Sequence, residues 1–527
     1  MLDNDNGIYA EDATTGGLLT QIGVGITTKP VATSFLTVIT QSSASAAIAI
    51  GSVSTLTAGN LYSISSLSDL NKLASLVNSG QASNCTFILT GDIDMANSPG
   101  YIPIGTDEHK FMGTFYGNGH VISNVSISQS GTSGVGIFGV TGNTARILDL
   151  GVENATVSGK DYTGVIVGNS AGTITNCYVK GNVNVNGNSY VGAITGQATN
   201  TIASSYTSGN ININGSGYVG GLAGYINSSV RNSFVQDVNV TSSSGKAGGF
   251  TGVFGSAASY DKISIKGTIN VSGSNCIGGY VGSSDISLSN LNANVTGTVK
   301  ATSGYVGGIA GSISSSRTIS NCNATMSITG SGGNYVGGIV GYANSATISQ
   351  SSYNGTITAT GTSSVGGIAG VSASVITNCT ASGMINASGS SSSIGGIIGS
   401  MSNGNVTNCN SNMNINNSGT GNYIGGLIGQ LSSSSIVVSK SYSTGNITAA
   451  NSSYVGGLIG DIRTNGHITI NSCYTTGNVT GSSNVGGFAG RIYADSNSGD
   501  SYYQVYIETS SVSYTHLRAH ETSQDLV

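Results

Sequence analysis

Short apolar runs recur along most of the chain at a nearly constant interval, and each is built on closely spaced glycines. The segment Tyr218–Gly224 reads Tyr-Val-Gly-Gly-Leu-Ala-Gly, and close variants of it return every 28 to 31 residues. Self-similarity at such a period is the signature of a repeat architecture. The first glycines of the thirteen copies are Gly136, Gly164, Gly192, Gly220, Gly248, Gly278, Gly307, Gly337, Gly366, Gly395, Gly425, Gly456 and Gly486.

The second half of each repeat predicts strands rather than helices. After Gly164 the chain reads Ile-Thr-Asn-Cys-Tyr over 174–178 and then Gly-Asn-Val-Asn-Val over 181–185. Such segments are short, rich in Val, Ile, Thr and Tyr, alternate with period two, and are bounded by Gly, Ser or Asn. We therefore expect an all-β fold, a parallel β-solenoid of about thirteen coils of 28–31 residues. Equivalent strands of successive coils would stack at about 4.8 Å.

The same pattern assigns positions within a coil. Val219, Leu222, Ile211 and their equivalents are expected to fill the interior. Paired glycines fit either a corner with positive φ or a place where coils approach closely. Asparagines repeated in register are expected to form side-chain ladders along the axis. These asparagines are Asn176, Asn232, Asn321, Asn378 and Asn408.

One helix is expected before the repeats. Residues 67–80 carry apolar residues at helical spacing, with Ser66 or Ser68 as N-cap and Gly80 as the stop. A short helix at this place would cap the N-terminal end of the solenoid, where strand edges are otherwise unpaired.

The organisation along the chain follows from these features. We expect an irregular N-terminal segment over 1–55, read as a fragment end, then a cap with the first coils over 56–130 and the repeat solenoid over 131–490. Residues 491–512 are expected to hold either the C-terminal end of the solenoid or an incomplete coil, with one strand over 502–507. Residues 513–527 change composition abruptly and resemble translated adapter sequence at the ends of metagenomic reading frames, so we expect a non-native tail.

Three motifs stand out over about residues 60–490: ILTGDIDM over 88–95, Phe-x-Gly-x-Phe-x-Gly-Asn-Gly-His over 111–120, and the recurring Gly-Gly-x-x-Gly. Together they resemble the GLUG-repeat region of bacterial surface proteins. Tyr116 departs from the pattern, since similar sequences have Asp before Gly-Asn-Gly. The resemblance implies an extracellular bacterial protein, often adhesive, and kinship with the pectate-lyase-like β-helix. GLUG repeats also form a non-catalytic part of some immunoglobulin-A-cleaving metallopeptidases.

Composition narrows the classes of function. Only 7% of residues are charged and the net charge is −5, with no basic patch, so nucleic acid is not expected as a partner. No run of 18 apolar residues exists, so we expect no membrane span in this chain.

Seven cysteines are too few for a disulfide scaffold in 527 residues. The repeat position that holds Cys177 and Cys322 is Ser205 or Ser233 in other coils, which indicates a small buried site. Cys379 and Cys409 lie in adjacent coils. A bridge between them is one alternative and a pair of free buried thiols is the favoured one.

The search for catalytic or metal-binding chemistry finds no candidate. Within the repeats the acids do not recur at one position, and we expect them to be solvated turn residues; they are Asp149, Glu153, Asp161, Asp237, Asp261, Asp285 and Asp461. Asp92 and Asp94, near Asp107-Glu108-His109, are interpreted as turn and cap residues rather than a calcium or catalytic site. No His-Glu-x-x-His occurs. We therefore predict no catalytic residue, no metal and no cofactor.

Tyrosine columns are the best candidates for ligand contact. Six tyrosines directly precede the Val-Gly or Ile-Gly of their coils, and exposed stacked rings of this kind bind sugars or proteins. The alternative, which the regular spacing favours, is that the rings stack on one another and close the corners of the coils. The six are Tyr190, Tyr218, Tyr305, Tyr335, Tyr423 and Tyr454.

The sequence as a whole favours a non-enzymatic, extracellular bacterial surface protein, an adhesive or stalk-like solenoid. Host glycans, mucin or extracellular proteins are the expected partners. The first alternative is the non-catalytic repeat region of a secreted IgA-protease-like metallopeptidase. A carbohydrate-active β-helix enzyme is the second, and it is disfavoured because the repeats lack clustered acids.

Overall fold

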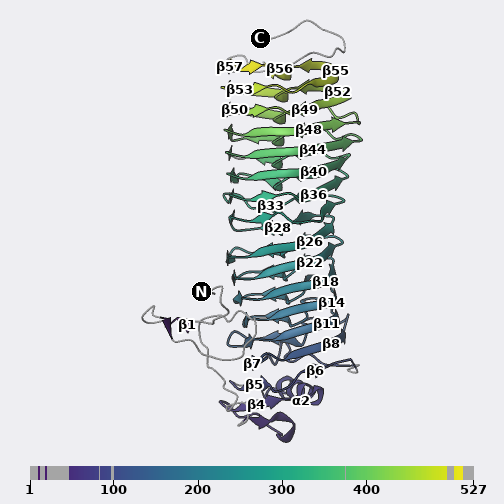
Figure 1. Ribbon diagram of the computed structural model, residues 1–527, viewed down its shortest axis with the longest axis vertical. Coiled ribbons are helices and arrows are strands. Elements are labelled where there is room, and N and C mark those ends of the chain that lie inside the picture. The colour runs from purple at the N-terminus through teal and green to yellow at the C-terminus, as the bar shows by residue number, and fades with distance from the viewer. Residues whose placement is uncertain are drawn as a thin grey trace. The chain divides into compact units, whose positions relative to one another are not determined.

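The computed structural model describes residues 10–11, 18–19, 47–81, 84–96, 100–373, 375–494 and 504–513 (Figure 1). Within these residues the fold is nearly all-β, a parallel β-solenoid of about 15 turns with one α-helix near the N-terminal end. The predicted fold class is therefore confirmed. Most of the expected irregular segment 1–55, and the expected tail from residue 514 onward, lie outside the described residues.

The elements of the earlier coils are short. Beside a 3₁₀ turn, η1 (Ile50–Ser52), and a helix, α2 (Leu67–Asn78), the described chain forms strands. In chain order these are β1 (Ala10–Glu11), β2 (Leu18–Leu19), β3 (Ile48–Ala49), β4 (Leu61–Ile64), β5 (Thr86–Leu89), β6 (Ile93–Asp94), β7 (Thr114–Tyr116), β8 (Val121–Ser128), β9 (Phe138–Thr141), β10 (Arg146–Leu148), β11 (Gly151–Ser158), β12 (Val167–Ser170), β13 (Thr173–Thr175), β14 (Tyr178–Asn186), β15 (Tyr190–Gly192), β16 (Thr195–Ala198), β17 (Ile202–Ala203), β18 (Tyr206–Gly215), β19 (Tyr218–Gly220), β20 (Ala223–Ile226), β21 (Ser229–Arg231), β22 (Phe234–Ser242), β23 (Lys246–Gly248), β24 (Thr251–Phe254), β25 (Ser259–Asp261) and β26 (Ser264–Gly273).

The later coils continue in the same manner. Their strands are β27 (Cys276–Gly278), β28 (Val281–Ser284), β29 (Leu288–Ser289), β30 (Asn292–Ala293), β31 (Thr298–Ala301), β32 (Tyr305–Gly307), β33 (Ala310–Ile313), β34 (Thr318–Ser320), β35 (Asn323–Ala324), β36 (Ser327–Ser331), β37 (Tyr335–Gly337), β38 (Val340–Ala343), β39 (Thr347–Ser349), β40 (Ser352–Thr360), β41 (Ser364–Gly366), β42 (Ala369–Ala373), β43 (Ile376–Thr377), β44 (Thr380–Ser388), β45 (Ser393–Gly395), β46 (Ile398–Asn403), β47 (Asn405–Thr407), β48 (Asn410–Asn417), β49 (Tyr423–Gly425), β50 (Ile428–Ser439), β51 (Tyr442–Ser443), β52 (Ile447–Gly456), β53 (Ile459–Asn471), β54 (Tyr474–Thr475), β55 (Val479–Gly486), β56 (Ala489–Ala494), β57 (Gln504–Glu508) and β58 (Ser511–Val512).

The described residues divide into two compact units that alternate along the chain between Gly215 and Ile265. In the first, β14 pairs in parallel with β18, so that Tyr178 lies beside Tyr206. In the second, β40 pairs in parallel with β44 from Ser352 beside Thr380 onward. In each unit a strand therefore pairs with the strand one repeat further along, and a residue type that recurs in the sequence becomes a column in space.

The number of turns exceeds the thirteen glycine motifs because early coils stack without that motif. In the first unit β4 pairs with β5, and β5 pairs with β7, so that Phe87 lies beside Phe115. Large aromatic rings fill this part of the core, with Phe111 and Phe138 at 5.0 Å between ring centroids. These turns lie before Gly136 and lack the glycine motif, and Phe87 and Phe115 stand in the register that Ile147 and Ile174 occupy in the following coils.

The predicted helix is confirmed at both ends. Helix α2 spans Leu67–Asn78, and its N-cap is Ser66, whose Oγ accepts a hydrogen bond from the Asp69 N–H at 3.2 Å. Gly80, with φ of +88°, follows the helix and donates its N–H to the carbonyl of Val77.

Close approach of neighbouring coils, rather than positive φ, explains the second glycine of each pair. Gly308 and Gly338 have no positive φ. A Cβ built on Gly308 would overlap the carbonyl oxygen of Gly338 and lie 2.8 Å from the Ala324 Cβ. Gly338 meets the carbonyl of Gly367 in the same way. A column of second glycines therefore runs through the later coils because no Cβ fits between their backbones.

The predicted asparagine ladders are confirmed in part, and the structure adds a second reason for asparagine. Asn408 donates its Nδ2 to the Oδ1 of Asn378 at 2.7 Å, and Asn321 donates likewise to Asn290 at 2.6 Å. Asn378 and Asn408 have φ of 55° and 53°. The corner requires the left-handed conformation, which asparagine tolerates better than most residues.

The shared Cys and Ser position is a small buried site that needs both a donor and an acceptor. Ser205 accepts a hydrogen bond from the Cys177 N–H at 3.1 Å and donates its Oγ to the Ala203 carbonyl at 2.9 Å. Cys177 directs its Sγ at the equivalent Thr175 carbonyl at 3.3 Å. Hydroxyl and thiol groups both meet this requirement. Cys379 and Cys409 are free, so the favoured alternative of two unbridged thiols is confirmed.

Replacing Gly308 by Val is expected to lower the free energy of unfolding by about 1–3 kcal/mol, because the new side chain must displace backbone of the next coil. Thermal and denaturant unfolding followed by circular dichroism measure the change. The matched control is Gly131→Val, because a Cβ at Gly131 meets no atom within 4 Å. Equal stability of the two variants would contradict the steric explanation.

The seven thiols are expected to be unreactive in the folded chain. Burial raises the pKa of Cys177 to about 12 and that of Cys322 to about 11, so both stay protonated and shielded at pH 8. Ellman's reagent should therefore titrate almost no thiol before denaturation and seven after it. Finding only five in denaturant without reductant would show a bridge instead.

Candidate functional site: a tyrosine row and a buried carboxylate

The positions directly before Val-Gly or Ile-Gly form a row, here called the tyrosine row. In the second unit Tyr305 pairs with Tyr335, Tyr335 with Ser364, Ser364 with Ser393, and Ser393 with Tyr423. Because the strands are parallel and in register, these side chains stand one above another along the axis. The row is therefore continuous in position but not in residue type.

A first aromatic group in this unit contains two of the predicted tyrosines. The ring centroids of Tyr305 and Tyr335 lie 5.4 Å apart with planes 12° from parallel. Tyr342, from β38, lies 4.8 Å from Tyr305 and 5.9 Å from Tyr335. All three rings are half-buried, so each presents an edge or part of a face to solvent.

A second aromatic group lies further along the row. The rings of Tyr423 and Tyr454 stack at 5.7 Å with an interplanar angle of 27°. The guanidinium carbon of Arg491 lies 4.0 Å above the centre of the Tyr454 ring, and that of Arg463 lies 5.3 Å from the Tyr423 centre. Contact between a cation and an aromatic face stabilises both partners.

Small side chains separate the two groups. Ser364 and Ser393 occupy the row between Tyr335 and Tyr423, and they are 5% and 3% exposed. Three coil spacings of about 4.8 Å place the two tyrosines roughly 14 Å apart along the axis. The row therefore holds large flat rings on both sides of a stretch that carries only serine.

The other predicted tyrosines lie elsewhere. In the first unit Tyr190 stacks on Tyr162 at 4.8 Å with planes 5° apart, and Tyr225 meets it edge-on at 6.1 Å. In the second unit Tyr218 lies beneath the Nζ of Lys246 at 5.5 Å. Tyr190 thus lies in the first unit, and the other five predicted tyrosines are distributed along the row in the second.

Stacking of the rings on one another, the favoured alternative, is confirmed for five of the six predicted tyrosines. The tyrosines that follow the Cys and Ser position behave similarly: Tyr442 stacks on Tyr474 at 4.7 Å, whereas Tyr353 is buried. Stacking does not remove the half-buried rings from solvent. Whether the six predicted tyrosines contact a ligand therefore stays a prediction.

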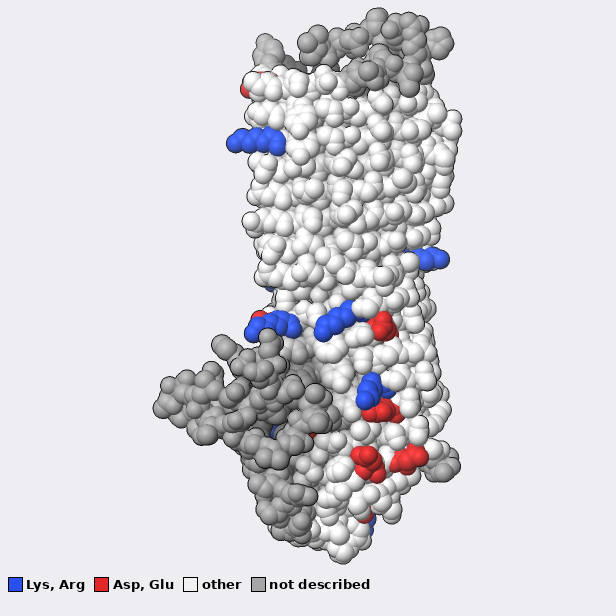
Figure 2. Space-filling model, viewed as in Figure 1, with Lys and Arg blue, Asp and Glu red and all other residues white. Residues whose placement is uncertain are grey.

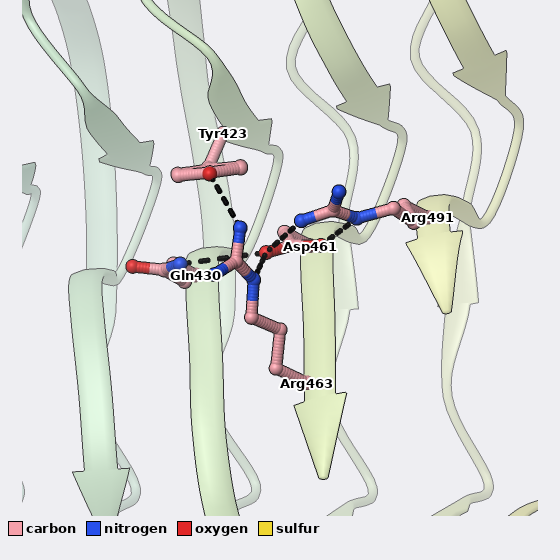
Figure 3. Close-up of polar contacts among 5 residues, drawn as sticks. All are labelled: Tyr423, Gln430, Asp461, Arg463 and Arg491. Atoms are coloured by element: carbon pink, nitrogen blue, oxygen red, sulfur yellow. Dashed lines mark hydrogen bonds and ion pairs between the residues drawn. The ribbon is translucent and has the colours of Figure 1, made fainter. Parts of the chain in front are cut away.

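A buried ion cluster joins the second aromatic group, and the sequence did not reveal it (Figure 3). Asp461, from β53, is fully buried, and its Oδ1 accepts from the Arg491 Nε at 2.6 Å. Its Oδ2 accepts from the Arg463 Nε at 2.8 Å and the Arg491 Nη2 at 3.0 Å. Gln430 donates to the same oxygen at 3.4 Å, and the Arg463 Nη2 donates to the Tyr423 hydroxyl at 2.6 Å.

The expectation that Asp461 is a solvated turn residue is wrong. It lies within a strand, beside Gln430 on one side and Arg491 on the other. The two guanidinium groups and the Gln430 amide donate hydrogen bonds to its carboxylate, and the hydrogen bonds to Asp461 raise the pKa of Arg491. A signal was present, since Arg491 follows Asp461 by about one repeat and Arg463 follows it by two residues on the same face.

The early acidic group performs turn chemistry, as expected. Asp92 accepts from the Val121 N–H at 3.0 Å and lies 3.1 Å from the His120 Nδ1. Asp94 accepts from Asn124 and from the Ala96 N–H, which lowers its pKa. Among the described residues, no group of three or more His, Cys, Asp or Glu side chains is arranged to hold a metal ion.

Uncharged side chains make up most of the viewed surface of the described residues (Figure 2). In the part of the chain that the structure describes, no helix combines the length and the apolar character that crossing a membrane requires. The fold and the rows on it define a class, a parallel β-solenoid repeat protein.

Comparisons with known proteins give partial sequence matches. No family model matches the chain. A stretch of 138 residues, 24% of the chain, is 38% identical to halomucin of Haloquadratum walsbyi and covers 2% of it. A stretch of 102 residues, 18% of the chain, is 32% identical to a protein of Evansella cellulosilytica that is provisionally named a Gly-rich membrane protein, and covers 12% of it. The chain thus spans a small part of both curated relatives, and these matches fit a surface or repeat protein.

One solved structure aligns with the solenoid. It is a crystal structure of a Bacteroides ovatus protein provisionally named an immunoglobulin A1 protease. The alignment covers 63% of this chain and 76% of that one at 22% identity, with a TM-score of 0.30. At this TM-score the likeness carries no argument about function.

Replacing Asp461 by Asn is expected to destabilise the coils around β53 by about 2 kcal/mol, because the two guanidinium groups lose their shared charged acceptor. Denaturant unfolding measures the change. The control Asp107→Asn alters an exposed carboxylate and should leave stability unchanged within about 0.5 kcal/mol. If Asp461→Asn also left the free energy of unfolding unchanged, the ion cluster would not contribute to stability.

Proposed function

We propose that this chain is the non-enzymatic solenoid of an extracellular bacterial surface protein, of the GLUG-repeat type, and that it binds glycans through the tyrosine row. The observation that carries the proposal is the pair of half-buried aromatic groups on either side of Ser364 and Ser393. Tyrosine suits such a surface because it combines a large rigid ring with a polar tip and loses little side-chain entropy on binding.

Chemistry of the described residues favours binding over catalysis. Glycoside hydrolysis needs two carboxylates a few ångströms apart, one of them free to exchange a proton. Asp461 is the only acid between Asp285 and Asp495, and two arginines already bind it. The partial matches to halomucin and to a Gly-rich membrane protein support placement at the cell surface.

The test is a binding screen of the whole chain against host and bacterial glycans, with mucin and immunoglobulin A included. The double variant Tyr305→Ser, Tyr335→Ser should weaken glycan binding roughly tenfold or more, because a contact surface depends on a few aromatic residues. Retained circular dichroism and an unchanged unfolding midpoint would show that the variant is folded.

The matched control is Tyr442→Ser, Tyr474→Ser, which removes another stacked pair outside the tyrosine row. It should bind as the unaltered chain does. Equal loss in both double variants, or no glycan bound by the unaltered chain, would contradict the role given to the row.

A further inference from the structure

Tyr423 and Tyr454 of the tyrosine row contact two arginines that together carry more positive charge than Asp461 neutralises. We infer that Tyr423, Arg463 and Arg491 form a binding site for the anionic groups of an acidic polysaccharide, its carboxylates or sulfate esters. This inference rests on the proposed glycan binding and deepens it, since it names the class of glycan.

The charge balance of the cluster is the first argument. Arg491 already binds Asp461 through its Nε and Nη2, an arrangement that satisfies a buried carboxylate by itself. Arg463 adds a second guanidinium to the same carboxylate at 2.8 Å. Two like charges around one acid oppose each other, so neutralising Asp461 does not explain the second arginine. An added anion would balance the excess charge.

Unused hydrogen-bond donors are the second argument. The Nη1 groups of Arg463 and Arg491 make no hydrogen bond to a described residue, whereas their other nitrogens hold Asp461 and Tyr423. The side chain of Arg463 is 42% exposed and that of Arg491 is 24% exposed. Both guanidinium groups can therefore meet a ligand from solvent, and guanidinium donors match the geometry of carboxylate and sulfate oxygens.

Preorganisation is the third argument. Asp461 and the Tyr423 hydroxyl hold Arg463, while Asp461 and the Tyr454 ring hold Arg491. An arginine fixed in this way loses little further freedom when it binds, so more of the contact energy becomes affinity. Free surface lysines lack this advantage.

The surroundings favour the same ligand. Between residues 286 and 494 the chain carries five Lys and Arg against the single acid Asp461, although the whole chain has a net charge of −5. The coil before Tyr423 places Ser393 and Ser400 beside Tyr423 and Gln430. A sugar ring can therefore lie against the Tyr423 side of the site while its acidic group reaches the arginines.

The test compares polygalacturonate with its fully methyl-esterified form, which has the same backbone without the charge. The whole chain should bind the acid form about tenfold more tightly, and added salt should reduce only this preference. Dextran sulfate against dextran repeats the comparison for sulfate esters. A preference for either acidic polymer supports the inference, and the polymer that binds more tightly tells which group the site takes.

Arg463→Gln should remove most of the preference for the acidic polymer, leave binding of the neutral polymer unchanged, and keep the Asp461–Arg491 contact. Arg317→Gln removes the same charge from an exposed position of an earlier coil. It should change neither the preference for the acidic polymer nor the binding of the neutral polymer. Should Arg463→Gln unfold, Arg463→Lys keeps the charge without the planar donor pair, and a partial loss of preference is expected.

The outcomes separate the two proposals. Equal binding of acidic and neutral polymers, or a preference that survives Arg463→Gln in a folded chain, would overturn the acidic-ligand inference and leave glycan binding intact. If Arg317→Gln lost the preference for the acidic polymer as fully as Arg463→Gln does, the preference would be a general effect of charge. That result would also overturn the acidic-ligand inference. Absence of binding to every polymer would overturn the proposed function itself.

Discussion

Parallel backbone hydrogen bonding between successive coils is the constraint on which the rest of the structure depends. Each coil must follow the path of the last closely enough for strands to pair in register, as β40 does with β44 over nine residue pairs. This leaves no room for a side chain where the backbones come closest, which is why Gly308, Gly338 and Gly367 recur there. The same superposition arranges every repeated residue in a column.

A column imposes one local environment on many residues, and the chemistry of each column follows from that environment. Ser205 and Cys177 share a column because both give a donor and an acceptor in a small buried space. Asn378 and Asn408 share another because the corner needs positive φ. Tyr305 and Tyr335 stack because their positions superimpose at coil spacing. A residue type that recurs at one position of successive coils is therefore explained in the first place by the requirements of the fold.

Much of this was predictable from the sequence, because a period in the chain becomes a period in space. The coil length, the strands, the helix with its Ser66 cap and the buried thiols all follow from local pattern. The sequence did not predict why the second glycine of each pair is required, because positive φ and a close approach of two backbones both require glycine. The first coils were expected over 56–130, but a count of glycine motifs could not include them, because the strands that carry Phe87 and Phe115 lie before the first motif. The Asp461 cluster was missed because it is not periodic.

The repeat pattern did not predict the Asp461 cluster, and this indicates which positions of a repeat solenoid carry binding specificity. A residue that repeats in every coil is already explained by the fold, so binding specificity must come from positions where a column changes. In the second unit the tyrosine row changes residue type at Lys246, Cys276, Ser364, Ser393 and Asn484. Beside Tyr423 the structure also places a buried carboxylate and two arginines, in coils that otherwise carry few charges. Asp461 is buried and paired, and a buried ion pair often contributes no more stability than apolar side chains of similar volume. Stability therefore gives no reason for the cluster beside Tyr423 and Tyr454, which agrees with the anionic ligand that we propose for it.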